Sequence, residues 1–231
     1  EAWAGRLLAL PERYRAPPRI EMRVRPWYNP EQRSAVFIVP GVVGILLTIT
    51  MTLVTSTAIV RERERGTLEQ LIVTPISKTS LLLGKLVPFV LVGFVQMTVV
   101  LLLGKLLFAM PTIGSVALLY LLTVPFIVAS LGIGLLISTV ARNQLQAMQI
   151  SVFFMLPNIL LSGYIFPRVA MPLPAQWIGF ALPLTFYLDV LRGILLKGIG
   201  LPHLWRPTLA LTLFAILVFA LSVKRFSKTI E

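Results

Sequence analysis

The sequence predicts an all-α fold, a polytopic membrane helical bundle of about five transmembrane helices. Hydrophobic residues make up 57% of the 231 residues, and charged residues only 13%, against about 25% in soluble domains. Long uncharged stretches recur, and Lys and Arg collect at their edges, as they do in membrane proteins. The net charge of +12 therefore does not indicate a nucleic-acid partner, which would require cations gathered on one soluble face.

Five stretches are long enough to cross a bilayer, which takes about 20 consecutive apolar residues. The first and third contain no charged residue. Their approximate ranges are 35–60, 86–108, 114–141, 146–165 and 207–223.

A further apolar stretch, 178–198, is interrupted by Pro183 and carries Asp189 and Arg192. With residues 156–174 before it, this stretch predicts an external re-entrant pair of half-helices. Such backbone is tolerated at membrane depth only where protein or a wet cavity satisfies it. The alternative is a sixth full span, which would move the C-terminus to the other side. Asp189 and Arg192 are three residues apart, so we expect them to pair on one helix face.

The distribution of Lys and Arg predicts the orientation of the spans. Five spans place the 61–85 loop, Arg142 and the tail cations Lys224 and Arg225 on one side, which is predicted to be cytoplasmic. Within the third span, small residues recur at every fourth position. This stripe favours close helix packing, either within the chain or at a dimer seam; its members are Ser130, Gly134 and Ser138.

The stretch 59–78 reads IVRERERGTLEQLIVTPISK, the densest group of charges in the chain. Thr67 and Gln70 fit a capping box, and three apolar residues after Thr67 form one stripe. Pro75 disfavours continuation of a helix through the residue before it. The pattern predicts a short amphipathic helix at the membrane surface, preceded by a charged elbow at 61–65 and a break at Gly66. A solvated loop whose arginines anchor the span against anionic lipid is the alternative.

These residues resemble the ABC-2 class of ATP-binding-cassette transporter permeases. The stretch RERERGTLEQLIVTPIS is similar to the family's first cytoplasmic loop, and residues 160–198 to its external re-entrant region. WYNPE at 27–31 and FIVPG at 37–41 resemble its drug-export branch. The resemblance covers roughly 27–228. Because such permeases carry a first helix and an external domain before WYNPE, it implies that residues 1–34 are the C-terminal remnant of an external, periplasmic domain and 35–231 the transmembrane domain.

The resemblance also implies function. The chain would be the non-catalytic permease subunit of an ABC exporter in a bacterial inner membrane, moving hydrophobic or amphipathic substrate by alternating access, as in multidrug efflux. The short helix would be a coupling helix seated in a separate ATPase subunit, which would hold ATP and Mg; this chain would bind no cofactor. Further expected partners are a second permease subunit, a periplasmic adaptor and membrane lipid. The residues expected to couple to the ATPase are Glu62, Arg63, Glu64, Arg65, Gly66, Thr67, Leu68, Glu69, Gln70, Leu71 and Arg142.

Several polar residues within the spans are candidates for a substrate path, each with a packing alternative. Threonine hydroxyls can bond their own helix carbonyls, and a single Gln or Asn can bridge helices. The path candidates are Thr48, Thr52, Thr55, Gln96 and Asn158, and the candidates for an external gate are Phe166, Pro167, Pro183 and Phe186.

The chain has no phosphate-binding G-x-x-x-x-G-K-[ST] motif and no H-E-x-x-H, so no ATPase or zinc-protease chemistry is expected of it. With no Cys and one His, no metal site is expected. Two other functions remain open: a secondary carrier or channel built on broken helices, and an ABC exporter of polysaccharide or lipid. The uncharged span centres count against an ion-coupled carrier. A membrane-embedded lipid enzyme would need an interfacial cluster of His or acids, which the sequence lacks.

Overall fold

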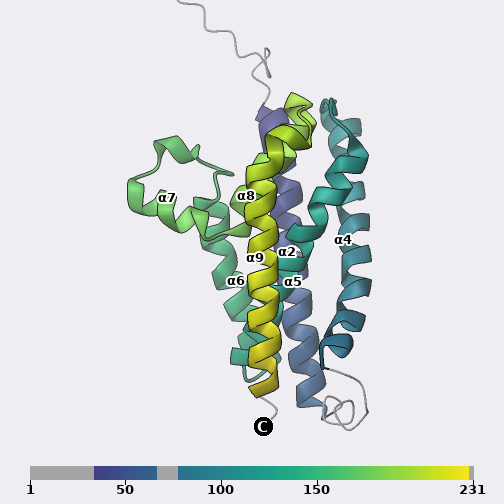
Figure 1. Cartoon of the computed structure of the whole chain (residues 1–231), viewed down its shortest axis with the longest axis vertical. Coiled ribbons are helices and arrows are strands. Elements are labelled where there is room, and N and C mark those ends of the chain that lie inside the picture. Colours follow the sequence, from purple (N-terminus) through teal and green to yellow (C-terminus); the bar gives the residue numbers. More distant parts are fainter. Residues whose placement is uncertain (1–33, 67–77, 229–231) are drawn as a thin grey trace, which may run out of the picture. The chain divides into compact units, whose positions relative to one another are not determined.

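Long helices account for most of the chain described by the structure, a computed structural model that describes residues 34–66 and 78–228. All of these residues belong to one compact unit, 33–231. The long helices lie along the length of the bundle (Figure 1). In chain order they are α2 (Ser34–Glu64), α4 (Lys78–Phe108), α5 (Val116–Val140), α6 (Gln144–Leu161), the 3-10 turn η2 (Arg168–Ala170), α7 (Leu173–Phe180), α8 (Pro183–Lys197) and α9 (Leu201–Lys228).

Five of the described helices are long and apolar enough to cross a membrane, and a sixth is added if the bent pair Leu173–Phe180 and Pro183–Lys197 counts as one span. This agrees with the predicted polytopic bundle of about five spans, with a sixth as the alternative. The bundle has an upper end, where α2 begins, and a lower end, where α2 and α9 end (Figure 1). The end of α2, the start of α4, the α5–α6 turn and the end of α9 all lie at the lower end, so the described basic residues grouped by sequence do share one side. Two predicted boundaries were wrong. Helix α2 continues through the charged run to Glu64, and α9 begins at Leu201 with Pro207 inside it.

Helices α2 and α5 form the centre of the bundle. About half of each span is buried, whereas only 17% of α4, 17% of α6 and 22% of α9 is buried. The small residues of α5 explain its central place, because each lets another backbone approach. A Cβ on Gly134 would lie 2.8 Å from the Thr52 carbonyl oxygen of α2, and one on Gly132 would lie 3.0 Å from Val218 of α9. The stripe of small residues on α5 therefore packs within the chain.

The main hydrophobic core lies in the upper half of the bundle, where α8 packs against α2 and α5. Phe126 of α5 stacks on Tyr187 of α8, with ring centroids 3.9 Å apart. The Tyr187 hydroxyl lies 3.0 Å from the Thr123 hydroxyl, so this buried polar group is paired. A paired hydroxyl avoids the cost of burying an unsatisfied polar group in an apolar core.

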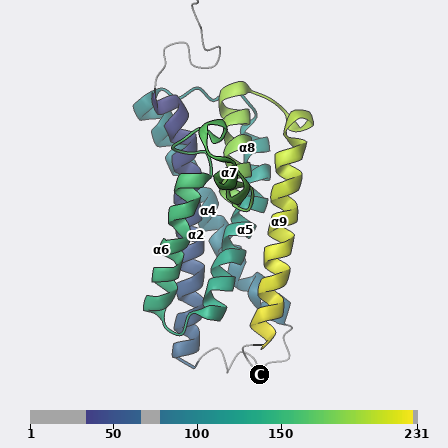
Figure 2. The ribbon, with the colours of Figure 1, turned by 90° about the vertical axis from the view of Figure 1, so that its left-hand side faces the viewer.

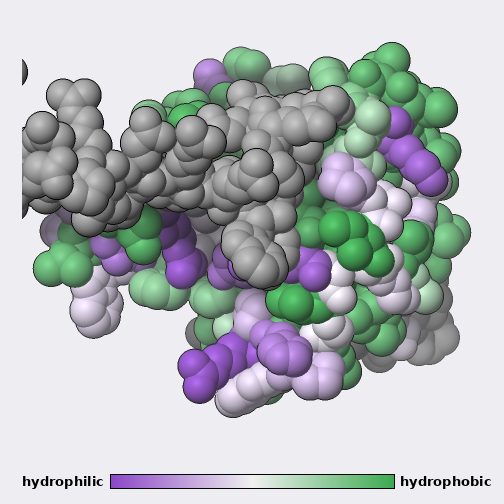
Figure 3. All heavy atoms as spheres, turned by 90° about the horizontal axis from the view of Figure 1, so that it is seen from above, coloured by the Kyte–Doolittle hydropathy of each residue, from purple (hydrophilic) through white to green (hydrophobic). Residues whose placement is uncertain are grey.

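The pair α7 and α8 is bent by 85° at its break, and its contacts favour the predicted re-entrant hairpin over a sixth span. The Arg192 guanidinium of α8 donates a hydrogen bond to the Gly163 carbonyl just after α6. The Ile113 N–H before α5 donates to the Leu195 carbonyl near the end of α8. The segment that leads from α6 toward the pair and the end of α8 therefore lie at the same end of the bundle. Figure 2 shows α7 in front of the bundle, with α6 and α9 to either side. Viewed from the upper end, much of the visible rim is hydrophobic, with small separate hydrophilic groups (Figure 3).

Candidate functional site

The charged run predicted to couple to an ATPase forms the last turn of α2. Gly66 follows at φ 68°, and its N–H donates to the Arg63 carbonyl. A glycine in the left-handed conformation is a common way to end a helix, so the predicted break at Gly66 is confirmed. The elbow predicted at 61–65 was wrong, because residues 61–64 are helical. Good helix formers such as Arg and Glu carry the helix past the end of the apolar stretch.

Successive residues of this turn point to different neighbours, because consecutive helical positions are about 100° apart. Glu62 forms an ion pair with Lys85 of α4. Arg63 donates to the Ser138 carbonyl of α5 at 3.2 Å and to the Ala141 carbonyl that follows α5. These oxygens lie at the negative end of the α5 dipole, where a cation is favourable.

Glu64 and Arg61 both bind Gln144, the first residue of α6. The Gln144 backbone N–H donates to the Glu64 carboxylate at 3.0 Å, and its side-chain amide donates to the other oxygen of that carboxylate. Arg61 Nε donates to the Gln144 side-chain oxygen at 3.1 Å. A carboxylate at a helix N-terminus satisfies a free N–H and complements the helix dipole. The alternating acidic and basic residues of 61–64 therefore serve contacts with three different neighbouring helices, α4, α5 and α6.

The remaining coupling candidates divide between exposed residues and residues outside the described part of the chain. Arg65 and Arg142 are exposed at the lower end. Thr67, Leu68, Glu69, Gln70 and Leu71, which carry the predicted coupling helix and capping box, lie outside the described residues. Lys85 of α4, which forms an ion pair with Glu62 of this turn, was not predicted from the sequence. The available signal was a lysine directly before the predicted second span, at the end of the span where the charged run also lies.

The predicted threonine stripe lies in the α2–α5 interface. The Thr48 hydroxyl donates to the Gly44 carbonyl of its own helix at 2.8 Å, and the Thr52 hydroxyl donates to the Ser130 carbonyl at 3.3 Å. Thr55 is fully buried, and its hydroxyl has no hydrogen-bond partner. Within one subunit these contacts serve helix packing, and substrate contact by the three residues stays a prediction.

The other two path candidates also make contacts within the chain. Gln96 of α4 donates to the Thr50 hydroxyl of α2 at 2.9 Å, which bridges the two helices. Asn158 is buried in α6, and its amide donates to the Phe154 carbonyl at 3.0 Å. One side-chain oxygen of each residue has no partner. Both oxygens are buried, and their role in a path stays a prediction.

The external gate candidates lie on the hairpin at the upper end. Phe186 packs against Phe180 across the bend, with centroids 6.4 Å apart, and Arg168 lies over the Phe180 ring at 4.8 Å. Pro183 is buried at the first turn of α8, where its missing N–H costs nothing. Phe166 and Pro167 are exposed before η2. The four residues thus belong to one hairpin, although two are exposed and Pro183 is buried.

Arg192 fixes the hairpin to the start of α2. Its guanidinium lies 3.8 Å from the Phe37 ring centroid and donates to the Gly163 carbonyl at 3.0 Å. The described residues show no close Asp189–Arg192 ion pair, although the two charges still attract each other; the guanidinium makes the two contacts above instead. A planar cation stacks well on an aromatic face, so the tertiary contacts outcompete the local pair.

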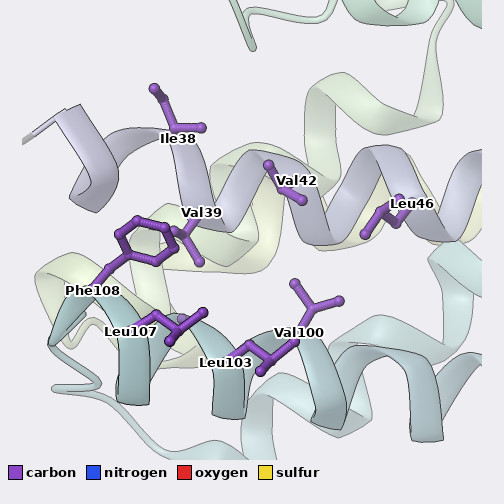
Figure 4. A pocket seen from close by; sticks show the side chains of 9 residues that line it. Ile38, Val39, Val42, Leu46, Val100, Leu103, Leu107 and Phe108 are labelled. Atoms are coloured by element: carbon purple, nitrogen blue, oxygen red, sulfur yellow. The ribbon is translucent and has the colours of Figure 1, made fainter.

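A groove between α2 and α4 opens at the side of the upper half, with a volume of about 530 Å³. Figure 4 shows side chains from the two helices facing each other across it. No charged residue lines this groove; the lining is Ile38, Val39, Val42, Leu46, Val100, Leu103, Gly104, Leu107 and Phe108. In the described part of the chain no group of three or more His, Asp or Glu could hold a metal ion.

The fold defines a multi-pass helical membrane protein with a re-entrant hairpin at one end and a polar helix junction at the other. Comparison with known families places it further. The model of the ABC-2 family transporter protein matches residues 7–224. The chain therefore belongs to the ABC-2 transporter family, which confirms the resemblance seen in its sequence.

Individual relatives agree with this assignment. The chain is 40% identical over 200 residues to the probable multidrug ABC transporter permease YbhR of Escherichia coli, covering 85% of this chain and 54% of that protein. It is 37% identical over 182 residues to YbhS, another probable multidrug ABC transporter permease of that organism, covering 78% and 48%. The inner membrane transport permease YhhJ is 32% identical over 231 residues, covering 98% and 61%. The chain thus spans roughly half of these curated relatives.

Proposed function

We propose that the chain is the membrane-spanning part of an ABC exporter, and that it is driven by a separate ATPase subunit docking at the lower end. The observation that carries this proposal is the polar junction at the end of α2. There, one helical turn binds α4, α5 and the start of α6, directly before the segment that resembles the family's coupling helix. A motor that pushes on this segment would act on three spans together.

The chain supplies no nucleotide chemistry in this proposal. ATP and Mg are held by the partner ATPase, and no cofactor is bound by this chain. Two permease subunits form the complete transporter, since much of α4, α6 and α9 is exposed in one subunit. The complex resides in a bacterial inner membrane, and a periplasmic adaptor joins it at the upper end. The names of the relatives, two of them multidrug permeases, support the export assignment.

Hydrophobic or amphipathic compounds are the substrate class that we propose. The uncharged spans support this class, because burying a charged substrate among them without a partner group would be costly. In alternating access, closure of the ATPase moves the lower ends of the spans, and the external hairpin then acts as the gate. Its Phe180–Phe186 contact spans the bend, so a change of angle between α7 and α8 would separate these rings.

The coupling assignment is tested by two substitutions in the segment after Gly66, Glu69→Lys and Leu71→Asp. We expect both to abolish co-purification of the ATPase or ATP-stimulated transport while the spans still insert, because one reverses a charge and the other places a charge on the apolar stripe. Lys224→Gln is the matched control, an exposed cation on α9 at the same end. If both loop variants couple as well as the control, the assignment of the coupling helix is wrong.

A further inference from the structure

The end of α2 is held to the start of α6 more tightly than a surface charge cluster requires. The Gln144 side-chain oxygen accepts a hydrogen bond from the Arg61 guanidinium. The Gln144 side-chain amide and backbone N–H both donate to the Glu64 carboxylate. All three bonds join the same two elements. Because one residue is held by partners one helical turn apart on α2, the start of α6 cannot rotate freely against that turn.

The end of α5 is held to the same turn. Arg63 donates to two carbonyls around the end of α5, those of Ser138 and Ala141. The α5–α6 turn is short, and Asn143 caps α6 by accepting from the Gln146 N–H at 2.7 Å. Both sides of this turn are therefore tied to α2, one by a cation at a helix C-terminus and the other by an anion at a helix N-terminus.

Packing above the polar contacts continues the same connection. Val60 of α2 packs with Ala141 and Ala147 in a small buried cluster. One turn higher, the Ser56 hydroxyl of α2 lies 2.9 Å from the Ser151 hydroxyl of α6. The three helices are thus in contact from their polar ends into the apolar interior, which is the arrangement expected of a unit that moves as one body.

We infer that Arg61, Arg63 and Glu64 are positioning residues that lock the α5–α6 turn to the end of α2. A displacement of the segment after Gly66 is thereby delivered to α5 and α6 together with α2. The inference rests on the proposed function and deepens it. Arg61 and Glu64 are exposed, as are Arg65 and Arg142. What sets Arg61, Arg63 and Glu64 apart is that their side chains bond other helices of their own chain.

The first experiment measures transport per ATP hydrolysed by the full-length permease reconstituted with its ATPase. For Glu64→Ala and Arg63→Met we expect this ratio to fall about tenfold, as substitutions along coupling networks can do, while ATPase binding and hydrolysis persist. Lys224→Gln is the control. Glu64→Gln keeps one acceptor oxygen but loses the charge and the second acceptor, so it should lie between Glu64→Ala and the wild type. A ratio unchanged in Glu64→Ala and Arg63→Met overturns the inference.

A second experiment replaces the polar tie by a covalent one. The chain has no cysteine, so the double variant Glu64→Cys/Gln144→Cys can be joined by a short bis-thiol-reactive linker. We expect the unlinked variant to be uncoupled and the linked one to regain transport, since the two elements move together. A linked variant that remains uncoupled, or an unlinked variant that transports as well as the wild type, would overturn the inference.

The two experiments distinguish the inference from the proposed function. If the wild-type permease neither binds nor responds to an ATPase, the proposed function fails. If the wild type couples and the variants lose assembly together with transport, the residues serve folding alone and the inference fails. Only a reduced ratio of transport to hydrolysis in an assembled complex supports both.

Discussion

At the residue scale, small side chains decide where the helices meet. The Gly134 position lies against the backbone of α2, with a Cβ placed 2.8 Å from both the Thr52 oxygen and the Thr55 Cβ. A backbone oxygen held within a helix cannot move aside as a flexible side chain can. The closeness of α2 and α5 therefore depends on the absence of one methyl group.

The substitution Gly134→Val tests this dependence. We expect a loss of stability of about 1–3 kcal/mol, the usual range for an overpacked core, seen as a lower unfolding temperature in detergent. Gly84→Ala is the control, because nothing lies within 4 Å of its added Cβ, and alanine in a helix is favoured over glycine by about 1 kcal/mol. A Gly134→Val protein as stable as Gly84→Ala would contradict the packing described.

At the element scale, the external hairpin is held in place by an arginine that the sequence led us to assign elsewhere. Spacing along α8 indicated an ion pair with Asp189, but Arg192 contacts the start of α2 and the loop after α6. One side chain thus connects three elements that are distant in sequence. The hairpin should loosen when this connection is removed.

Arg192→Met should expose the loop between α6 and η2. Ser162 is 2% exposed, so a cysteine placed there reports opening through its rate of labelling by a membrane-impermeant maleimide. We expect labelling to accelerate about tenfold, since a desolvated cation–π contact contributes roughly 1–2 kcal/mol. Lys105→Met, which removes an exposed cation of α4, is the control. Equal labelling in the two variants would show that Arg192 does not hold the hairpin.

Much of the element order was predictable from the sequence, because a bilayer sets the length of a span and charges mark its ends. The position at which α2 ends was not predictable from the sequence. Hydropathy stops at Val60, whereas the helix continues to Glu64 because its charged residues find partners on other helices. Such partners, Lys85 and Gln144, are 20 residues or more away along the chain, and no local pattern identifies them. The burial of Thr48, Thr52 and Thr55 was likewise decided by what α5 presents to them.

At the scale of the whole molecule, the two ends of the bundle differ in construction. The lower end is fastened by charges and helix caps around the turn at Arg61–Glu64, whereas the upper end is formed by a hairpin with aromatic and cation–π contacts. Between them, α2 and α5 form a close-packed centre. This arrangement suits a protein that receives force at one end and opens at the other, as the proposed exporter does.

The most direct test of that proposal is transport in sealed vesicles containing the full-length permease and its ATPase, followed with a fluorescent amphipathic dye that carries no net charge. We predict accumulation that requires ATP and Mg, persists when ionophores collapse the ion gradients, and is lost when the ATPase is omitted. Transport driven by an ion gradient in vesicles that lack the ATPase would contradict an ATP-driven permease and favour a secondary carrier.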